Sequence, residues 1–280
     1  MKKFKFNKLL LSGGGIKGIG ICGALDKLEE ETNILSNIKT IIGTSIGAYI
    51  AFFLSIGLSV KKIRIIFENI DFSEFQEFDI KLLLSKFGLD EGNKFFSFVK
   101  ATIITQNLNP NITFAELAKI SNYQIILVGT NVNTSKPVYF SAENTPDMLV
   151  TLALRISCGY PFAFTPVEMN GELYADGGLA SPIASELIEK KELNKTLAIV
   201  LHRGFERYET NDLKSYGFGV ISCMVDSLLD SKLARLKHYI VISYPVNSMN
   251  FSITKEEKNK IFEYAREKTK DWLDKFIKQS

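Results

Sequence analysis

Residues 43–47 read Gly43-Thr44-Ser45-Ile46-Gly47 and connect a short apolar run at 38–42 to a longer uncharged run. The pattern Gly-x-Ser-x-Gly is typical of a sharp strand-to-helix turn that strains the backbone and projects the serine Oγ into a cleft. Glycines flank the serine because side chains there would clash in so tight a turn. The next helix would direct its positive N-terminus at Ser45, which favours developing negative charge. Ser45 is therefore a candidate nucleophile, with a purely structural turn as the alternative.

A glycine-rich turn precedes this motif. It reads Gly13-Gly14-Gly15-Ile16-Lys17-Gly18 and follows an apolar run at 9–11. Acyl transfer needs backbone N–H donors for the oxyanion of the tetrahedral intermediate, and a glycine turn at a helix start exposes such groups. The same letters fit the dinucleotide fingerprint, which requires an acidic residue at the end of the second strand. The second apolar run ends in Gly43-Thr44-Ser45 without an acid, so an oxyanion loop is favoured over a dinucleotide site.

An acidic turn stands more than a hundred positions later. It reads Tyr174-Ala175-Asp176-Gly177-Gly178. An aspartate followed by two glycines at a strand end forms a tight turn that can aim a carboxylate into a cleft. The alternative is an aspartate chosen for turn chemistry alone.

These three blocks, with a fourth that reads Ser157-Cys158-Gly159-Tyr160-Pro161, occur in the order found in one family. Over about residues 8–203 the chain resembles the patatin-like phospholipases, which are lipid acyl hydrolases. The resemblance implies that Ser45 is the nucleophile, that Asp176 is the general base and that Gly13, Gly14 and Gly15 supply oxyanion donors. Motif support comes from Lys17, Gly18, Gly43, Gly47, Ser157, Pro161, Gly177 and Gly178. The family commonly has Arg-Gly where this chain has Lys17-Gly18, which keeps the charge and loses the planar fork.

The resemblance also accounts for the shortage of histidine. The chain has only His202 and His238, and patatin-like enzymes use a Ser-Asp dyad without histidine. We interpret both histidines as structural. A carboxylate has an unperturbed pKa of roughly 4, yet it can accept the serine proton in concert with attack if it is well placed and partly desolvated. A catalytically inactive patatin-like scaffold or membrane-associated protein is the alternative of another class, ahead of a dinucleotide-binding protein.

Apolar runs alternate with helical patterns along the chain, which predicts βαβ organisation. Buried strands are expected near 9–11, 38–42, 125–128, 197–201 and 239–242, with 138–140 extending or pairing with one of them. Helices are expected near 17–31, after 47, near 146–156 and over 254–278. The predicted fold is a single α/β domain over 1–280, a three-layer α/β/α sandwich with a mostly parallel central sheet.

Two outer segments invite a functional interpretation. Residues 71–100 are rich in phenylalanine, so 71–110 is a candidate cap whose aromatic side chains form either helix core or a lipid-facing surface. In the C-terminal helix, Thr254 is the expected N-cap and Glu257 its capping-box partner. The apolar stripe of that helix predicts packing on the domain body, with a membrane-surface helix as the alternative.

Composition narrows the setting. The net charge of +3 is a weak excess and gives no reason to expect a nucleic-acid partner. Three scattered cysteines and no signal-peptide core predict a cytoplasmic protein. The uncharged run Ile41 to Val60 is a membrane-span candidate by hydropathy, but it contains the strand-to-helix turn, so a buried strand and helix are expected. No metal or cofactor and no oligomeric state are predicted. The expected partner is a phospholipid or other acyl lipid, with peripheral membrane contact.

Overall fold

The computed structural model describes residues 4–75, 77, 79–203, 211–247, 250 and 252–279, and Phe78 of the phenylalanine-rich segment lies outside them. One large sheet has the strand order β10-β9-β1-β2-β4-β8-β7, and β5 pairs with residues 127–131 of β4. The strands are β1 (Lys8–Leu11), β2 (Thr40–Thr44), β4 (Gln124–Asn131), β5 (Lys136–Phe140), β7 (Val167–Met169), β8 (Glu172–Asp176), β9 (Thr196–Leu201) and β10 (Tyr239–Ile242).

The sheet is parallel at its centre and antiparallel at one side. β10, β9, β1, β2 and β4 all pair in parallel, whereas β5, β7 and β8 join by antiparallel pairing. Parallel strands are covered on both faces and therefore consist of continuous apolar residues. In β9, every residue from Thr196 to Leu201 is buried.

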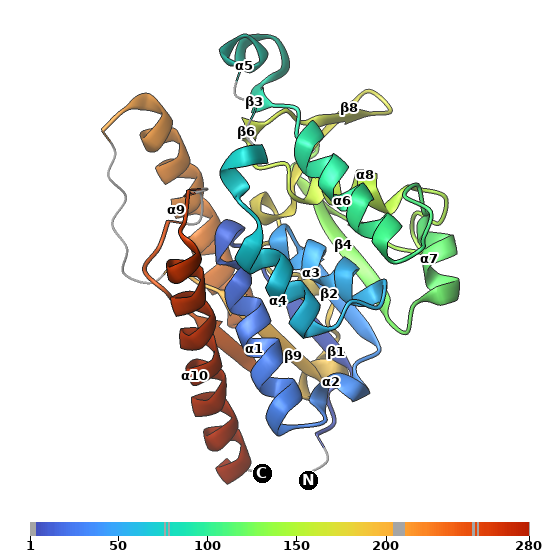
Figure 1. The fold of residues 1–280 in the computed structure, drawn as a ribbon, viewed down its shortest axis with the longest axis vertical. Helices are drawn as coiled ribbons and strands as arrows, with labels where there is room; N and C mark the ends of the chain where they lie inside the picture. Colours follow the sequence, from blue (N-terminus) through green and yellow to red (C-terminus); the bar gives the residue numbers. More distant parts are fainter. Residues whose placement is uncertain are drawn as a thin grey trace.

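Helices cover both faces of this sheet and complete three layers (Figure 1). Side chains alternate along each strand, so Leu9 and Leu11 join the core under α1 and α10, while Leu10 joins the core under α9. The predicted three-layer α/β fold is confirmed. The helices are α1 (Gly18–Glu31), α2 (Ile34–Asn37), α3 (Ile46–Ser55), α4 (Val60–Asn69), α5 (Ile80–Lys86), α6 (Asn93–Thr105), α7 (Phe114–Ile120), α8 (Val150–Ser157), α9 (Leu213–Leu233) and α10 (Lys255–Gln279).

The uncharged run from Ile41 to Val60 is not one helix. It contains the end of β2, the turn at Ser45 and all of α3, and both elements are buried. Across the described ranges, no helix is both long and apolar enough to cross a bilayer.

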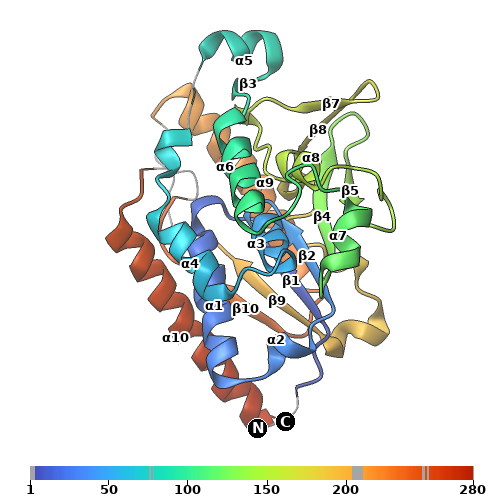
Figure 2. The same cartoon turned by 45° about the vertical axis from the view of Figure 1, so that its right-hand side comes forward.

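The C-terminal helix α10 packs along α1 (Figure 2). Its N-cap is Thr254, whose Oγ1 accepts a hydrogen bond from the Glu257 N–H at 3.2 Å. Ile261, Ala265 and Leu273 are fully buried against the body. Most of the apolar stripe of this helix is therefore core, and Ile277 near its end is exposed, with an exposed fraction of 38%. This favours packing on the domain body over a membrane-surface helix.

The predicted cap segment extends beyond the layers. It contains α5, the short strand β3 (Gly88–Asp90) and α6, and β3 forms a separate two-stranded parallel sheet with β6 (Phe162–Phe164). Arg155 on α8 fixes this small sheet, because its guanidinium donates to the carbonyl oxygens of Glu91 and Thr165 at 3.0 and 2.7 Å. In both views, α5 stands at the end opposite the chain termini (Figure 1, Figure 2).

Candidate active site

Ser45 occupies the turn between β2 and α3. Its backbone has φ 53° and ψ −124°, a strained combination for a residue with a side chain. Strain of this kind is typical of a nucleophile elbow, where the serine is held out of the regular strand. A Cβ on Gly43 would collide with the Gly47 carbonyl, and one on Gly47 would collide with the Leu11 carbonyl. Both glycines are therefore required by close approach of the backbone.

Asp176 ends β8, and strand pairing brings it to Ser45. Thr44 pairs with Val128 of β4, and the next residue of β4, Gly129, pairs with Asp176. The carboxyl ends of β2 and β8 therefore lie one residue apart along β4. Ser45 Oγ donates a hydrogen bond to Asp176 Oδ2 at 2.7 Å, across 131 positions of sequence.

The Asp176 carboxyl group is buried, with an exposed fraction of 3%. Burial raises the pKa of this carboxyl from 3.8 to about 7, and two hydrogen bonds oppose that rise. Asp176 Oδ1 accepts from the Gly178 N–H at 2.7 Å, and Oδ2 accepts from Ser45. Desolvation disfavours the charged form of an acid, so Asp176 can take up a proton near neutral pH.

The C-terminal end of α8 contacts the backbones of Ser45 and Asp176. Ser157 Oγ accepts from the Ser45 N–H at 3.0 Å and donates to the Val128 carbonyl at 2.6 Å. Two residues later, the Gly159 carbonyl accepts from the Asp176 N–H at 2.9 Å. The segment 157–159 thus fixes the strained turn and the acidic turn against the same helix end. The Ser157 to Pro161 block, singled out in the sequence, lies directly at the site.

The glycine-rich loop lies beside Ser45. A methyl group on Gly13 would be 3.3 Å from Ser45 Cβ, and one on Gly14 would be 2.6 Å from Leu201 Cβ. The Gly13 N–H donates to the Pro182 carbonyl at 3.2 Å, which leaves the expected donor role to the N–H groups of Gly14 and Gly15. Gly15 has φ 56°, which suits glycine.

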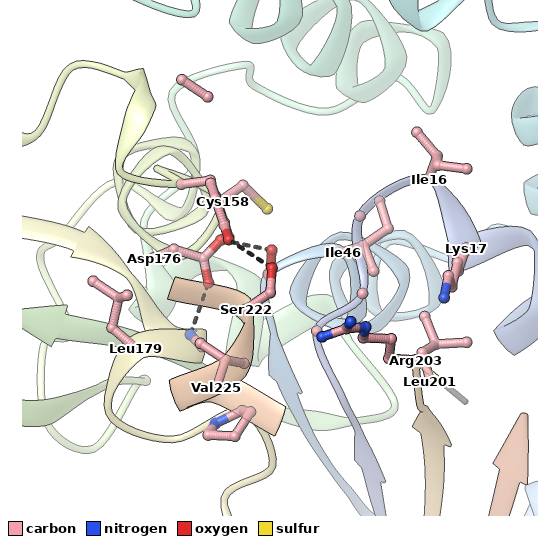
Figure 3. A pocket seen from close by; sticks show the side chains of 18 of the residues that line it. Ile16, Lys17, Ile46, Cys158, Asp176, Leu179, Leu201, Arg203, Ser222 and Val225 are labelled. Carbon is pink, nitrogen blue, oxygen red and sulfur yellow. Dashed lines mark hydrogen bonds between the residues drawn. The ribbon is translucent and has the colours of Figure 1, made fainter. Parts of the chain in front are cut away.

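A pocket of about 170 Å³ opens over Ser45 and Asp176. Figure 3 shows Asp176 and Cys158 on one side of it and Lys17 and Arg203 on the other. Lys17 is 4% exposed, and Arg203 pairs with Asp226 at 3.4 Å. Much of the wall is apolar, from Ile16, Ile46, Phe72, Phe95, Ala163, Phe164, Leu179, Leu201, Val225 and Leu229.

Cys158 is another side chain of this wall that could act as a nucleophile. Burial and the neighbouring Asp176 raise the pKa of its thiol well above the usual value. The thiolate is the reactive form of cysteine, so the environment keeps Cys158 inert and leaves the Ser45 hydroxyl as the candidate nucleophile.

The two histidines occupy different surroundings. His238 packs edge-on against Phe6 and Phe276, with ring centroids at 5.3 and 5.2 Å, which suits a structural residue. His202 lines the pocket, and its Nε2 lies 3.2 Å from Asp230 Oδ1. The sequence analysis did not place His202 in the pocket, although it follows the buried strand β9 at the same edge of the sheet as Ser45.

Helix α9 was not predicted either. Its residues Ser222, Val225, Asp226 and Leu229 form one wall of the pocket. Val225 and Leu229 are four residues apart, which places both on the inner face of the helix.

Known proteins resemble this chain in sequence and in fold. Residues 9–187 match the family model described as patatin-like phospholipase. The uncharacterized protein R571 of Acanthamoeba polyphaga mimivirus is 30% identical over 98% of this chain and 95% of its own length. The probable lipid hydrolase 463L of Invertebrate iridescent virus 6 is 28% identical over 84% of this chain and 86% of its own length.

Among solved structures, VipD from Legionella pneumophila superimposes with a TM-score of 0.74 at 20% identity. The match covers 97% of this chain and 67% of that one, and it shows a shared fold. The family match begins in β1, before the glycine-rich loop, and ends beyond the Asp176 turn. It therefore includes all four motif blocks, each of which contributes residues at the pocket. The chain belongs to the patatin-like phospholipase family.

Proposed function

We propose that the protein is a lipid acyl hydrolase of the phospholipase A type, which cleaves fatty acyl esters with Ser45 as nucleophile and Asp176 as base. The observation that carries this proposal is the 2.7 Å hydrogen bond from Ser45 Oγ to Asp176 Oδ2 inside the pocket. A nucleophile within hydrogen-bond reach of a base is the arrangement that covalent catalysis requires.

In the first step, Ser45 Oγ forms a bond to the acyl carbonyl carbon while its proton passes to Asp176. The carbonyl oxygen becomes an oxyanion, and the N–H groups of Gly14 and Gly15 together with the N-terminus of α3 favour that charge. Collapse of the intermediate breaks the ester bond, and the leaving alcohol takes the proton from Asp176. The product on the enzyme is an acyl-Ser45 ester.

In the second step, water gives a proton to Asp176 and attacks the acyl-Ser45 carbonyl. Collapse releases the fatty acid and returns the proton to Ser45 Oγ. A general base is most effective when its pKa lies near the working pH, and burial brings the pKa of Asp176 to about 7. The same buried carboxylate therefore serves both steps without a histidine.

The proposed substrate is a phospholipid or another acyl lipid. Apolar side chains such as Phe72, Phe95 and Leu229 suit a fatty acyl chain, and Lys17 and Arg203 place positive charge at the same pocket. The family model and the relative named as a probable lipid hydrolase support this class. Because such substrates reside in bilayers, peripheral contact with a membrane is part of the proposal.

A lipid-panel hydrolysis assay tests the proposal. Wild type should release fatty acid from at least one acyl lipid, Ser45→Ala should release none, and a fluorophosphonate probe should label wild type alone. A correctly folded wild type that neither hydrolyses any member of the panel nor reacts with the probe would instead be an inactive scaffold. Cofactor titration addresses dinucleotide binding, and saturable binding there would count against the proposal.

A further inference from the structure

Large apolar side chains are exposed on two segments next to the pocket, which together we name the apolar rim. One segment holds Ile80, Leu84, Phe87 and Phe162, from α5 and the β3–β6 sheet. The other holds Leu213, Tyr216, Val220 and Met224, from the first half of α9. In two views, α5 and the start of α9 lie at the same end of the molecule, beyond the carboxyl ends of the parallel strands (Figure 1, Figure 2).

The rim is continuous with the pocket wall. Phe162 directly precedes Ala163 and Phe164, and Met224 directly precedes Val225, and all three successors line the pocket. On α9, the exposed residues recur at spacings of three and four, so they form one stripe along the helix. Val225 and Leu229 leave from the opposite, inner face. On both β6 and α9, exposed apolar residues are therefore next to residues of the pocket wall along the chain.

Helix α5 contacts the neighbouring strand β3 but buries little of its own apolar surface. It is seven residues long, four of them are leucine or isoleucine, and none is buried. Isolated helices of this length are marginal in water, and protein helices are stabilised mainly by packing of an apolar face. Leu84 has an exposed fraction of 84%, so it gains little such packing from the described part of the chain. The helix is thus built to contact an apolar phase outside the protein.

Backbone strain directs two aromatic rings outward. Phe87 and Phe162 have φ values of 62° and 65°, a region that glycine adopts freely and bulky residues avoid. The two are neighbours, because Gly88 pairs with Phe162 in the small sheet. Their exposed fractions are 59% and 50%. A strained conformation kept by a bulky side chain that buries little indicates a role outside the folded core.

Charge favours an anionic surface. By sequence, Ile80–Lys86 and 213–225 together contain three lysines and no aspartate or glutamate. Lys86 pairs with Glu91 at 2.5 Å, so the positive excess of these two segments comes from Lys81 and Lys214. The flanking acids Asp79 and Asp212 are engaged as N-caps, accepting from the N–H groups of Lys81 and Ser215 at 2.8 and 2.6 Å. Apolar residues mixed with lysines are the pattern of segments that lie in the interface of anionic bilayers.

We infer that the apolar rim docks on a bilayer that contains anionic lipid, so that an acyl chain can pass from the membrane into the pocket between α5 and α9. The purpose of this docking rests on the proposed hydrolase function. The position of the rim identifies the occupant. A protein partner or second copy that covered both segments would seal the pocket, whereas a bilayer that covers them is itself the source of substrate.

The test measures binding to vesicles of equal parts phosphatidylcholine and phosphatidylglycerol by flotation. The rim variant combines Leu84→Ser, Phe87→Gly, Leu213→Ser and Met224→Ser. Its matched control combines Ile65→Ser, Ile104→Ser and Ile120→Ser, which remove exposed apolar side chains away from the rim. Removing several partly inserted apolar side chains should weaken vesicle affinity by about a hundredfold or more. The control should bind as wild type does, and Ser45→Ala should as well.

Two further measurements separate the possible outcomes. Hydrolysis of the water-soluble ester p-nitrophenyl butyrate should be equal in wild type and the rim variant, and Phe87→Gly alone should keep or raise the unfolding temperature because it relieves strain. Wild-type vesicle affinity in the rim variant, an equal loss in the control, or a wild-type dimer that the rim substitutions dissociate would each overturn the inference. If no ester is hydrolysed but vesicle binding still depends on the rim, the docking surface stands and the hydrolase proposal fails.

Discussion

Replacing Asp176 with asparagine should remove the base and stabilise the fold at the same time. Asparagine has the shape of aspartate, and its Oδ1 can still accept from the Gly178 N–H while its Nδ2 donates to Ser45 Oγ. Both hydrogen bonds of the native carboxyl therefore have a counterpart in the variant. What is lost is the ability to take a proton from Ser45, so hydrolysis should fall to background.

The stability change follows from the pKa of Asp176. Burial raises the folded-state pKa from 3.8 to about 7, so between these values the unfolded chain releases a proton that the folded chain keeps. The free energy of unfolding contributed by this group therefore falls as pH rises through that window and is constant above it. The difference of about three pKa units corresponds to about 4 kcal/mol, taken as an order of magnitude. The asparagine of Asp176→Asn does not titrate, so its contribution to the free energy of unfolding does not fall as pH rises.

Urea unfolding at pH 5 and pH 8, followed by the fluorescence of the single tryptophan, measures the effect. Relative to wild type, Asp176→Asn should gain about 2.5 kcal/mol more at pH 8 than at pH 5. The kcat/KM of wild type should rise about tenfold per pH unit below 7 and level off above it. His202 also lines the pocket, so His202→Ala is the control and should keep the same profile. Parallel pH dependence of stability in wild type and Asp176→Asn would refute the buried-base reasoning.

Further substitutions probe the site. Ser157→Ala removes the acceptor of the Ser45 N–H. The kcat and the rate of fluorophosphonate labelling should therefore both fall about a hundredfold while KM changes little. A lowered unfolding temperature with unchanged labelling would show that Ser157 has a structural role only. Gly14→Ala brings a methyl group to 2.6 Å from both Cβ and Cδ1 of the buried Leu201, so kcat and thermal stability should fall together; wild-type stability and turnover in this variant would contradict the collision. His202→Ala and His238→Ala should each keep turnover in hydrolysis assays, and a folded but inactive histidine variant would defeat the dyad.

The central elements of the fold were predictable because their signals are local. The buried strands at 9–11 and 197–201 are continuous apolar runs, and the run at 38–42 is apolar except for Lys39 and Thr40. The structure has β1, β9 and β2 there. The C-terminal helix was predictable from Thr254 at its N-cap and from a stripe of apolar residues. The four motif blocks, taken in their order, also predicted several of the residues that line the pocket.

Helix α9 could not be predicted in this way because its apolar residues lie on two faces, one exposed to solvent and one lining the pocket. Leu213, Tyr216, Val220 and Met224 are exposed on one face, while Val225 and Leu229 line the pocket from the other, so no single apolar stripe appears. The role of Ser157 was equally hidden, since it depends on a contact with Ser45 across 112 positions. Contacts of that range depend on strand order, which a single sequence does not encode locally.

The short segment at the end of α8 limits how this chain can change. Ser157 contacts the turn of Ser45, and Gly159 contacts the turn of Asp176. Arg155 on the same helix donates hydrogen bonds that hold the β3–β6 sheet. Inserting or deleting one residue there would rotate these contacts out of phase together. Length variation among relatives should therefore accumulate in surface loops such as 132–135, and a circularly permuted chain opened there should fold where one opened near 157 would not.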